Sequence, residues 1–206
     1  MISSEFDHSL LAEFTADNTL VAGVDEVGRG ALFGSVVAAA VVIPIAKIPQ
    51  LIAIGVQDSK KLSPKKRQEL IQPIKNLAVG WRISSASVSE IDRLNILQAS
   101  LLAMKRSILE LPITPDICLI DGNQLIPHLE LPQKTAIKGD LRSPVIAAAS
   151  ILAKVWRDEL IGELAERYPQ YDLARNKGYP TAKHRLAIQK YGICDRHRRS
   201  FKSCQN

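Results

Sequence analysis

Cysteine is scarce in this chain: among 206 residues only Cys118, Cys194 and Cys204 carry a thiol. No two of them form a Cys-x-x-Cys pair, three cannot all pair internally, and their spacing supports no zinc site. Cys118 lies in the apolar stretch 117–120, where a small buried side chain is expected. These observations argue against a fold that depends on disulfides and favour a reducing compartment.

Long uncharged stretches are also missing. The longest, residues 30–46, is shorter than the roughly 20 residues that a membrane-spanning helix needs, and Pro44 interrupts it. The N-terminal segment carries Glu5, Asp7 and Glu13 instead of the basic start of a signal peptide. We therefore expect a soluble, cytoplasmic protein that has no membrane partner.

The charge balance is modestly basic, with 27 Lys and Arg against 21 Asp and Glu and a formal net charge of +6. This excess favours a polyanionic partner, because bound cations displace counterions from phosphates. Many basic proteins bind no nucleic acid, so charge alone leaves the question open. Hydrophobic residues make up 46% of the chain, which is enough for a sizeable core in one domain.

The order of predicted elements indicates the fold class. Apolar or alternating stretches predict strands at residues 21–25, 35–43, 81–88, 117–120 and 135–137. Helices are predicted at 64–70, 90–109 and 144–167, opened respectively by Ser63-Pro64, by a capping box of Ser89 and Asp92, and by Ser143-Pro144. Residues 1–19 are predicted to be a short helix or a loosely held arm. Together these elements predict an α/β fold with a mixed sheet covered on its faces.

Four acidic residues stand where strands are predicted to end: Asp25, Glu26, Asp121 and Asp140. Functional groups collect at such edges of α/β sheets. Carboxylate oxygens are the ligands that Mg²⁺ prefers, and two ions about 4 Å apart can flank a scissile phosphate. Without a cation, clustered carboxylates repel one another and raise one another's pKa values. The pattern therefore predicts a two-metal site.

Asp25 and Glu26 are adjacent, and adjacent side chains on a regular strand point to opposite faces. We expect them to share a site only if the strand breaks there, which the glycines of Gly28-Arg29-Gly30 would permit. The same glycines would let backbone N–H groups approach a ligand, and Arg29 adds a forked donor for phosphate. Taken alone, the two acids are equally typical of a surface turn, and Asp121-Gly122 is an ordinary turn pair.

Six segments, in one order along the chain, strengthen this interpretation. They are Gly23-Val-Asp-Glu-Val-Gly-Arg-Gly30, Asp58-Ser-Lys-Lys-Leu62, Leu119-Ile-Asp-Gly-Asn123, Lys138-Gly-Asp140, Ala147-Ala-Ala-Ser-Ile-Leu-Ala-Lys-Val155 and Lys177-Gly-Tyr-Pro-Thr181. Together they resemble bacterial ribonuclease HII, the type 2 ribonuclease H, over nearly the whole chain. The resemblance implies a ribonuclease H-like α/β fold, a mixed five-stranded sheet flanked by helices with a helical C-terminal part. It divides the chain into an N-terminal arm, 1–19, and a catalytic domain, 20–206, that includes the helical extension.

The resemblance also implies roles for particular residues. Asp25, Glu26, Asp121 and Asp140 would be the catalytic acids and the ligands of two Mg²⁺ or Mn²⁺ ions. The nucleic-acid-binding residues would be Gly28, Arg29, Gly30, Lys60, Lys61, Ser143, Ser150 and Tyr179. Gly28 to Gly30 would sense the 2′-hydroxyl, the group that distinguishes RNA from DNA locally. Tyr179 would stack on the next deoxynucleotide, and Lys60 and Lys61 would contact phosphates.

Some of these residues have simpler explanations. Ser143 could serve simply as a helix cap, and Ser150 could simply fill a close contact. Tyr179 could cap a loop beside Pro180. Lys65, Lys66 and Arg67 could be a solvated helix face. His184 is the one histidine near a functional loop, and we expect a structural role for it. The sequence departs from the family at three positions: Ala31 and Ser35 stand where the family often has Pro, and Asn176 stands where it often has His. These differences put the rigidity of the loops in question.

The expected activity is endonucleolytic hydrolysis of the RNA strand of RNA/DNA hybrids, and incision 5′ to single ribonucleotides in duplex DNA. It would leave 3′-hydroxyl and 5′-phosphate ends and serve ribonucleotide removal and RNA primer degradation. The alternatives are a catalytically inactive nucleic-acid binder, an integrase or resolvase, and a type 3 ribonuclease H. A binder need not keep four acids, an integrase needs no Gly-Arg-Gly, and a type 3 enzyme usually carries an extra N-terminal domain, for which residues 1–19 leave no room. We expect a monomer and leave a partner in the replication or transcription machinery open.

Overall fold

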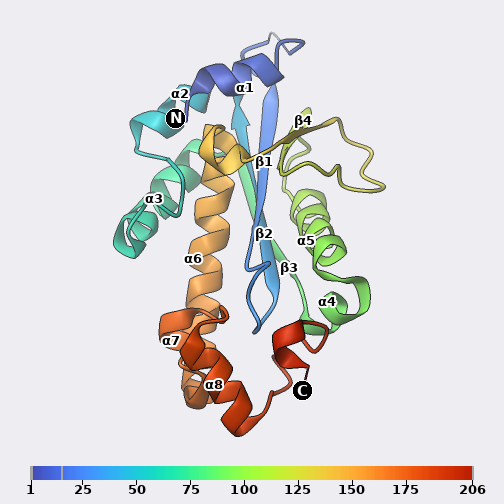
Figure 1. The fold of residues 1–206 in the computed structure, drawn as a ribbon. Helices are drawn as coiled ribbons and strands as arrows, with labels where there is room; N and C mark the ends of the chain where they lie inside the picture. Colours follow the sequence, from blue (N-terminus) through green and yellow to red (C-terminus); the bar gives the residue numbers. More distant parts are fainter. Residues whose placement is uncertain (1, 15, 206) are drawn as a thin grey trace.

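The structure is a computed structural model that describes residues 2–14 and 16–205. Met1 and Thr15 of the expected arm, and Asn206 of the expected catalytic domain, lie outside the described residues. Five strands in the described part form one mixed sheet in the order β3-β2-β1-β4-β5 (Figure 1). Their bounds are β1 Leu20–Val27, β2 Val36–Pro44, β3 Gly80–Ala86, β4 Ile117–Asp121 and β5 Gln133–Ala136. β2 is antiparallel to both β1 and β3, whereas β1, β4 and β5 run parallel.

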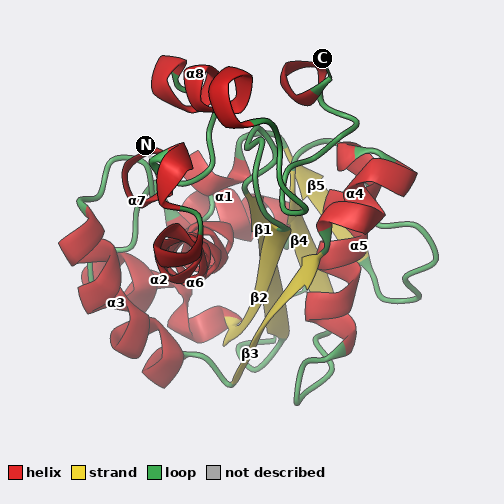
Figure 2. Ribbon diagram, turned by 90° about the horizontal axis from the view of Figure 1, so that it is seen from below, coloured by secondary structure: helices red, strands yellow, loops and turns green. Residues whose placement is uncertain are grey.

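Helices cover both faces of this sheet. They are α1 Ser4–Leu10, α2 Ile48–Ala53, α3 Pro64–Leu77, α4 Val88–Leu94, α5 Ile96–Leu109, α6 Pro144–Arg167, α7 Leu173–Asn176 and α8 Ala182–Tyr191, with short 3-10 turns at Ile45–Lys47, Gly139–Leu141, Pro169–Tyr171 and Lys202–Cys204. Helix α6 packs on one face with α3 beside it, α5 packs on the other, and α7 and α8 form the helical C-terminal part (Figures 1 and 2). The predicted α/β class and the mixed five-stranded sheet are confirmed.

Strand β2 is apolar throughout because both of its faces are buried. Alternate residues pack into two cores, one under α6 and one under α5. The α6 core takes Val37, Ala39, Val41 and Ile43, and the α5 core takes Val36, Ala38, Ala40 and Val42. The neighbouring β1 approaches α6 closely at Gly23, where a Cβ atom would overlap the backbone of Val145. This close contact places the first turns of α6 directly against the strand that carries Asp25.

The segment after β3 differs from its prediction. Strand β3 ends at Ala86, so the capping box is formed by Ser87 and Glu90 and not by Ser89 and Asp92. The Glu90 carboxylate accepts a hydrogen bond from the Ser87 N–H at 2.8 Å, which the shorter Asp side chain does less readily. The single predicted helix is two helices, because Asn95 has a φ of 73° and interrupts the helical backbone.

One other helix boundary moved, and the N-terminal segment takes the first of its two predicted forms. Helix α3 was expected to end near Leu70 but continues to Leu77 through Pro73, since Leu70 and Ile74 are buried in the core under α6. The N-terminal arm contains a packed helix and is not loosely held, because Leu11 is buried and the Leu10 carbonyl accepts a hydrogen bond from Lys134 Nζ at 2.7 Å.

None of the described helices combines the length and the apolar character that crossing a bilayer requires.

Candidate active site

Three of the four predicted acids meet at the edge of the sheet. Asp25 and Glu26 lie near the end of β1, and Asp121 is the last residue of β4, the parallel neighbour of β1. One carboxylate oxygen from each of the three lies within 4.8 Å of those of the other two. Asp25 is almost fully buried and the other two are half-buried. Residues separated by about 95 positions in the sequence thus form one cluster.

The expected strand break at this cluster is wrong. Strand β1 continues through Val27, and Asp25 and Glu26 pair in register with Ala39 and Ala38 of β2. The two acids still meet because the ladder between β1 and β4 stops one residue earlier, at Val24 and its partner in β4. Beyond that point β1 and β4 no longer pair, and the carboxylates of Asp25, Glu26 and Asp121 come together there. The Asp25 carboxylate also accepts a hydrogen bond from the Glu26 N–H at 2.7 Å.

Asp140 lies beside the three-acid cluster. It follows β5 in a 3-10 turn that begins after Lys138, whose φ of 55° is left-handed. This turn is tied to Asp121, because one oxygen of Asp121 accepts from the Gly139 N–H at 2.7 Å and from the Asp140 N–H at 3.4 Å. The Asp140 carboxylate itself pairs with Lys60 Nζ at 2.7 Å.

All four acids line one pocket of about 190 Å³. The side chains that share it are Asp25, Glu26, Val27, Ser59, Lys60, Asp121, Asp140, Ser150, Lys154 and Tyr179. A larger pocket, of about 320 Å³, lies against Ile108 and Leu131, but its lining has no cluster of acids. Chemistry and not size therefore identifies the site.

The carboxylates of the cluster destabilise one another's charged forms. Burial, followed by the charges of Glu26 and Asp121, raises the pKa of Asp25 well above its usual value. Burial and the charge of Asp140 raise the pKa of Asp121. Burial also raises the pKa of Glu26, and the nearby Arg29 guanidinium offsets this only in part. A divalent cation would remove the repulsion, and carboxylate oxygens are the donors that hard cations prefer. The donor set therefore fits the Mg²⁺ or Mn²⁺ expected from the sequence.

Comparison with known proteins assigns the family. Residues 22–204 match the family model named Ribonuclease HII. The chain belongs to the ribonuclease HII family. Ribonuclease HII of Acaryochloris marina is 62% identical over 185 residues, which cover 90% of this chain and 93% of that protein. These matches support type 2 over type 3.

Two solved structures agree with this assignment. The ribonuclease H2 of Pyrococcus horikoshii has a TM-score of 0.77 at 27% identity, covering 91% of this chain and 96% of that one. The PCNA:RNase HII complex of Archaeoglobus fulgidus gives a TM-score of 0.71, also at 27% identity, covering 89% and 95%. The ribonuclease H-like fold and the resemblance stated above are confirmed. This member of the ribonuclease HII family is accordingly an endoribonuclease, a hydrolase with ribonuclease H activity on RNA paired with DNA.

The Gly28-Arg29-Gly30 segment of this ribonuclease HII lies next to the acids. Gly28 has a φ of 94°, and a Cβ atom there would overlap the side chain of Arg157, so the position requires glycine. Arg29 is half-exposed and its Nη1 lies 3.2 Å from Glu26 Oε1. A Cβ atom on Gly30 would lie 3.9 Å from the Tyr179 ring. The structure thus brings this segment next to Glu26 and Tyr179, which both line the acidic pocket.

Of the other predicted nucleic-acid-binding residues, some line the pocket and some do not. Lys60 lines the pocket, whereas the exposed Lys61 does not. Ser150 lines it too, and its hydroxyl lies 3.1 Å from that of Ser59. Ser143 is fully buried outside the pocket lining, and its hydroxyl accepts a hydrogen bond from the Ile146 N–H at 3.1 Å, which caps α6.

Ser143→Ala tests whether the serine only caps the helix. We expect the free energy of unfolding to fall by about 1 kcal/mol, as is typical for loss of an N-terminal cap, while KM and kcat stay unchanged. Chemical denaturation and steady-state cleavage kinetics measure the two quantities. Ser63→Ala, which removes the equivalent cap of α3, is the matched control. A rise in KM for Ser143→Ala alone would instead assign the serine to substrate binding.

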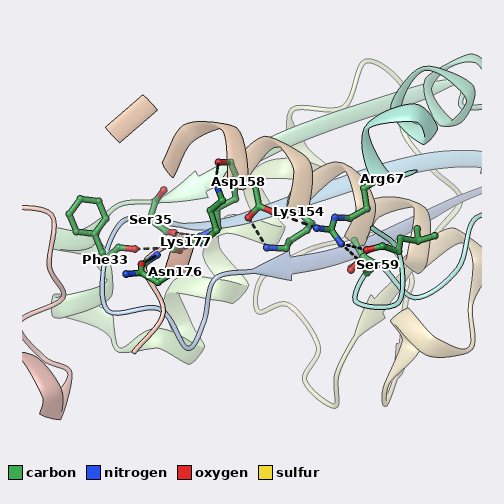
Figure 3. A network of polar contacts seen from close by, with 12 residues as sticks. Phe33, Ser35, Ser59, Arg67, Lys154, Asp158, Asn176 and Lys177 are labelled. Atoms are coloured by element: carbon green, nitrogen blue, oxygen red, sulfur yellow. Dashed lines mark hydrogen bonds and ion pairs between the residues drawn. The ribbon is translucent and has the colours of Figure 1, made fainter. Parts of the chain in front are cut away.

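Sequence reasoning missed a polar network along α6. Lys154 lines the pocket and its Nζ pairs with Asp158 at 2.6 Å, as Figure 3 shows. Arg67 is buried and not part of a solvated face, because its Nη1 donates to the carbonyls of Ser59 and Leu62. The signal that could have revealed this network is helical spacing, since residues 150, 154, 157 and 158 share one stripe of α6.

His184 has the structural role that was expected, with an unexpected partner. It is fully buried, its Nδ1 lies 3.0 Å from the Tyr179 carbonyl and its Nε2 lies 3.1 Å from Nε2 of His197. Burial lowers the pKa of His197 to about 4, so both rings are neutral at neutral pH. The sequence does not identify His197 as this partner, because 12 residues separate it from His184 and only the fold brings the two rings together.

Proposed function

We propose that this chain cuts the RNA strand of RNA/DNA hybrids and incises duplex DNA 5′ to single embedded ribonucleotides, leaving 3′-hydroxyl and 5′-phosphate ends. The observation that carries the proposal is the clustering of Asp25, Glu26 and Asp121 within 4.8 Å, beside a loop that requires glycine. In the cell this activity would serve ribonucleotide removal and RNA primer degradation in the cytoplasm.

The four acids are the proposed catalytic residues and metal ligands. Asp25, Glu26 and Asp121 would hold divalent cations together with Asp140, once Lys60 leaves its carboxylate. Two Mg²⁺ or Mn²⁺ ions bound there would supply Lewis-acid stabilisation of the phosphate and lower the pKa of the attacking water. The turn at Gly139 fixes the orientation of Asp121 through its N–H, whichever cation is bound.

Residues in and around the pocket would hold the nucleic acid. Gly28, Arg29 and Gly30 would contact the ribonucleotide and its 2′-hydroxyl, and Tyr179 would stack on the next deoxynucleotide. Lys60, which is 77% exposed, and the exposed Lys61 would contact phosphates. We assign this function to residues 20–206 and propose that the protein works as a monomer. The complex of the Archaeoglobus fulgidus relative with PCNA supports a partner in the replication machinery.

The direct test uses four labelled duplexes: DNA with one ribonucleotide, an RNA/DNA hybrid, all DNA and all RNA. Each is incubated with the protein, with and without Mg²⁺. We expect Mg²⁺-dependent cleavage of the first two, with the cut 5′ to the ribonucleotide. Cleavage of all-DNA duplex at a similar rate, or no cleavage of either ribonucleotide-containing substrate, would overturn the proposal.

Arg29→Ala tests the assignment of the loop. Removing a charged donor from a hydrogen bond costs about 1.5–3 kcal/mol, or roughly 10- to 100-fold in rate. We expect kcat/KM on the single-ribonucleotide duplex to fall by this factor, with Mn²⁺ affinity nearly unchanged. Arg93→Ala, an exposed arginine on α4, is the matched control and should leave kcat/KM unchanged. An unaltered preference for the lone ribonucleotide in Arg29→Ala would remove Arg29 from the site.

A further inference from the structure

Two arginines, Arg157 of α6 and Arg198 near the C-terminus, are completely buried. Neither forms an ion pair with an acid of residues 2–14 or 16–205. Buried charges are normally paired, because taking an unpaired ion out of water costs several kcal/mol. Two buried guanidiniums without a carboxylate partner must therefore be stabilised by other polar groups.

The partners of the two guanidiniums are backbone carbonyls. Arg157 donates to Phe33 at 3.1 Å, to Ser35 at 3.3 Å and to Lys177 at 2.9 Å. Arg198 donates to Arg29 at 2.8 Å and to Gly34 at 3.0 Å. Four of these five carbonyls belong to the loop that joins β1 to β2, and the fifth lies two residues before Tyr179.

Both arginines therefore fasten the segments that carry the proposed ribonucleotide contacts. The Arg157 side chain fills the space where Gly28 lacks a Cβ atom, and its guanidinium carbon lies 5.6 Å from the centre of the Tyr179 ring. Figure 3 shows the Phe33, Ser35 and Lys177 ends of this network, where the two loops lie side by side. Residues 28–35 include no proline that would stiffen the loop, and these hydrogen bonds hold four of its carbonyls in place.

The positive charge of the two arginines also favours an anionic ligand. Nη2 of Arg198 is buried and has no hydrogen-bond partner in the part of the chain that the structure describes. Burial lowers the pKa of Arg198 to about 9, which leaves it protonated at neutral pH. Positive charge in a low-dielectric interior acts over a longer range than it does in water. Beneath the Gly28–Gly30 loop it favours an anionic phosphodiester on the outer side.

We propose that Arg157 and Arg198 are positioning residues that set the geometry of the Gly28–Gly30 loop and of Tyr179, and thereby determine the preference for a single ribonucleotide in DNA. The inference rests on the proposed function. A lone ribonucleotide offers one productive register, whereas a long hybrid offers a ribose at every position. A displaced loop therefore reduces cleavage of the lone ribonucleotide more than cleavage of the hybrid.

The test replaces each arginine by lysine, which keeps the charge but loses the fork that reaches several carbonyls. kcat and KM are measured separately on the single-ribonucleotide duplex and on a long hybrid, well below the melting temperature of each variant. Mn²⁺ binding is measured by calorimetry. For Arg157→Lys and Arg198→Lys we expect the ratio of the two kcat/KM values to shift about tenfold toward the hybrid, with Mn²⁺ affinity within about twofold.

Arg67→Lys is the matched control, because Arg67 is also a buried arginine that donates to two backbone carbonyls, in a different loop. It should change both substrates alike and leave their ratio unaltered. An unchanged ratio in folded Arg157→Lys and Arg198→Lys overturns the inference while the proposed function stands. Loss of Mn²⁺ binding in these variants also overturns it, since the arginines would then support the whole site. If the unaltered protein cuts neither substrate, the proposed function fails and the inference fails with it.

Discussion

Replacing Asp121 by Asn is expected to lower the cleavage rate by about 10³-fold or more, because the metal site contributes several kcal/mol of transition-state stabilisation. The amide has no charge with which to hold a cation, but its oxygen can still accept the hydrogen bond from the Gly139 N–H. Folding should be intact. Removing one of three mutually repelling carboxylates should even stabilise the cation-free protein slightly. Single-turnover cleavage, Mn²⁺ titration by calorimetry and thermal unfolding measure the three effects.

Asp116→Asn is the matched control for this experiment. Asp116 stands just before the same strand, β4, and its carboxylate accepts a hydrogen bond from the Leu20 N–H at 2.7 Å. It therefore has the same chemistry at the opposite end of the β1–β4 pair, far from the pocket. We expect normal cleavage by Asp116→Asn. If Asp121→Asn kept its rate to within about tenfold, Asp121 would not be a metal ligand.

The fold was largely predictable because its strongest signals are local. Helix α6 begins and ends at the predicted residues, since Ser143-Pro144 is a strong start and the apolar run after it has no competing structure. The helix that was predicted whole is interrupted at Asn95, where one left-handed residue is enough to separate α4 from α5. Such a residue leaves no trace in the apolar periodicity, so a sequence pattern does not reveal it.

The four acids were predictable from their positions after strands, but the way in which they meet was not. The meeting of Asp25 and Glu26 depends on where β4 ends relative to β1, which is a fact of strand register. The buried arginines were harder still. Arg157 and Arg198 are 41 positions apart and look like ordinary charged residues until the fold encloses them. Long-range partners of this kind are set by tertiary packing and not by local pattern.

Asp7 carries the second large expected effect, on stability. It is fully buried where α1 meets the start of α6, and neither of its carboxyl oxygens has a hydrogen-bond partner among the described residues. Burial raises the pKa of Asp7 from 3.8 to about 7. Between these two values the folded state binds more protons than the unfolded state, so stability falls as the pH rises from about 4 to 7. At about 1.4 kcal/mol per pKa unit, the ionised carboxylate costs about 4 kcal/mol above pH 7.

Asp7→Asn should remove this pH-dependent loss. An unpaired buried amide costs about 1–3 kcal/mol, so we expect a net gain of about 1–3 kcal/mol in the free energy of unfolding at pH 8. At pH 5, where the native carboxyl is neutral, the gain should vanish. Urea unfolding at the two pH values measures the difference, and Asp17→Asn, the same change at an exposed position of the N-terminal segment, should show no such pH dependence. A variant that is less stable than the original protein at pH 8 would mean that Asp7 is ionised and stabilised there, with the positive end of α6 as its partner.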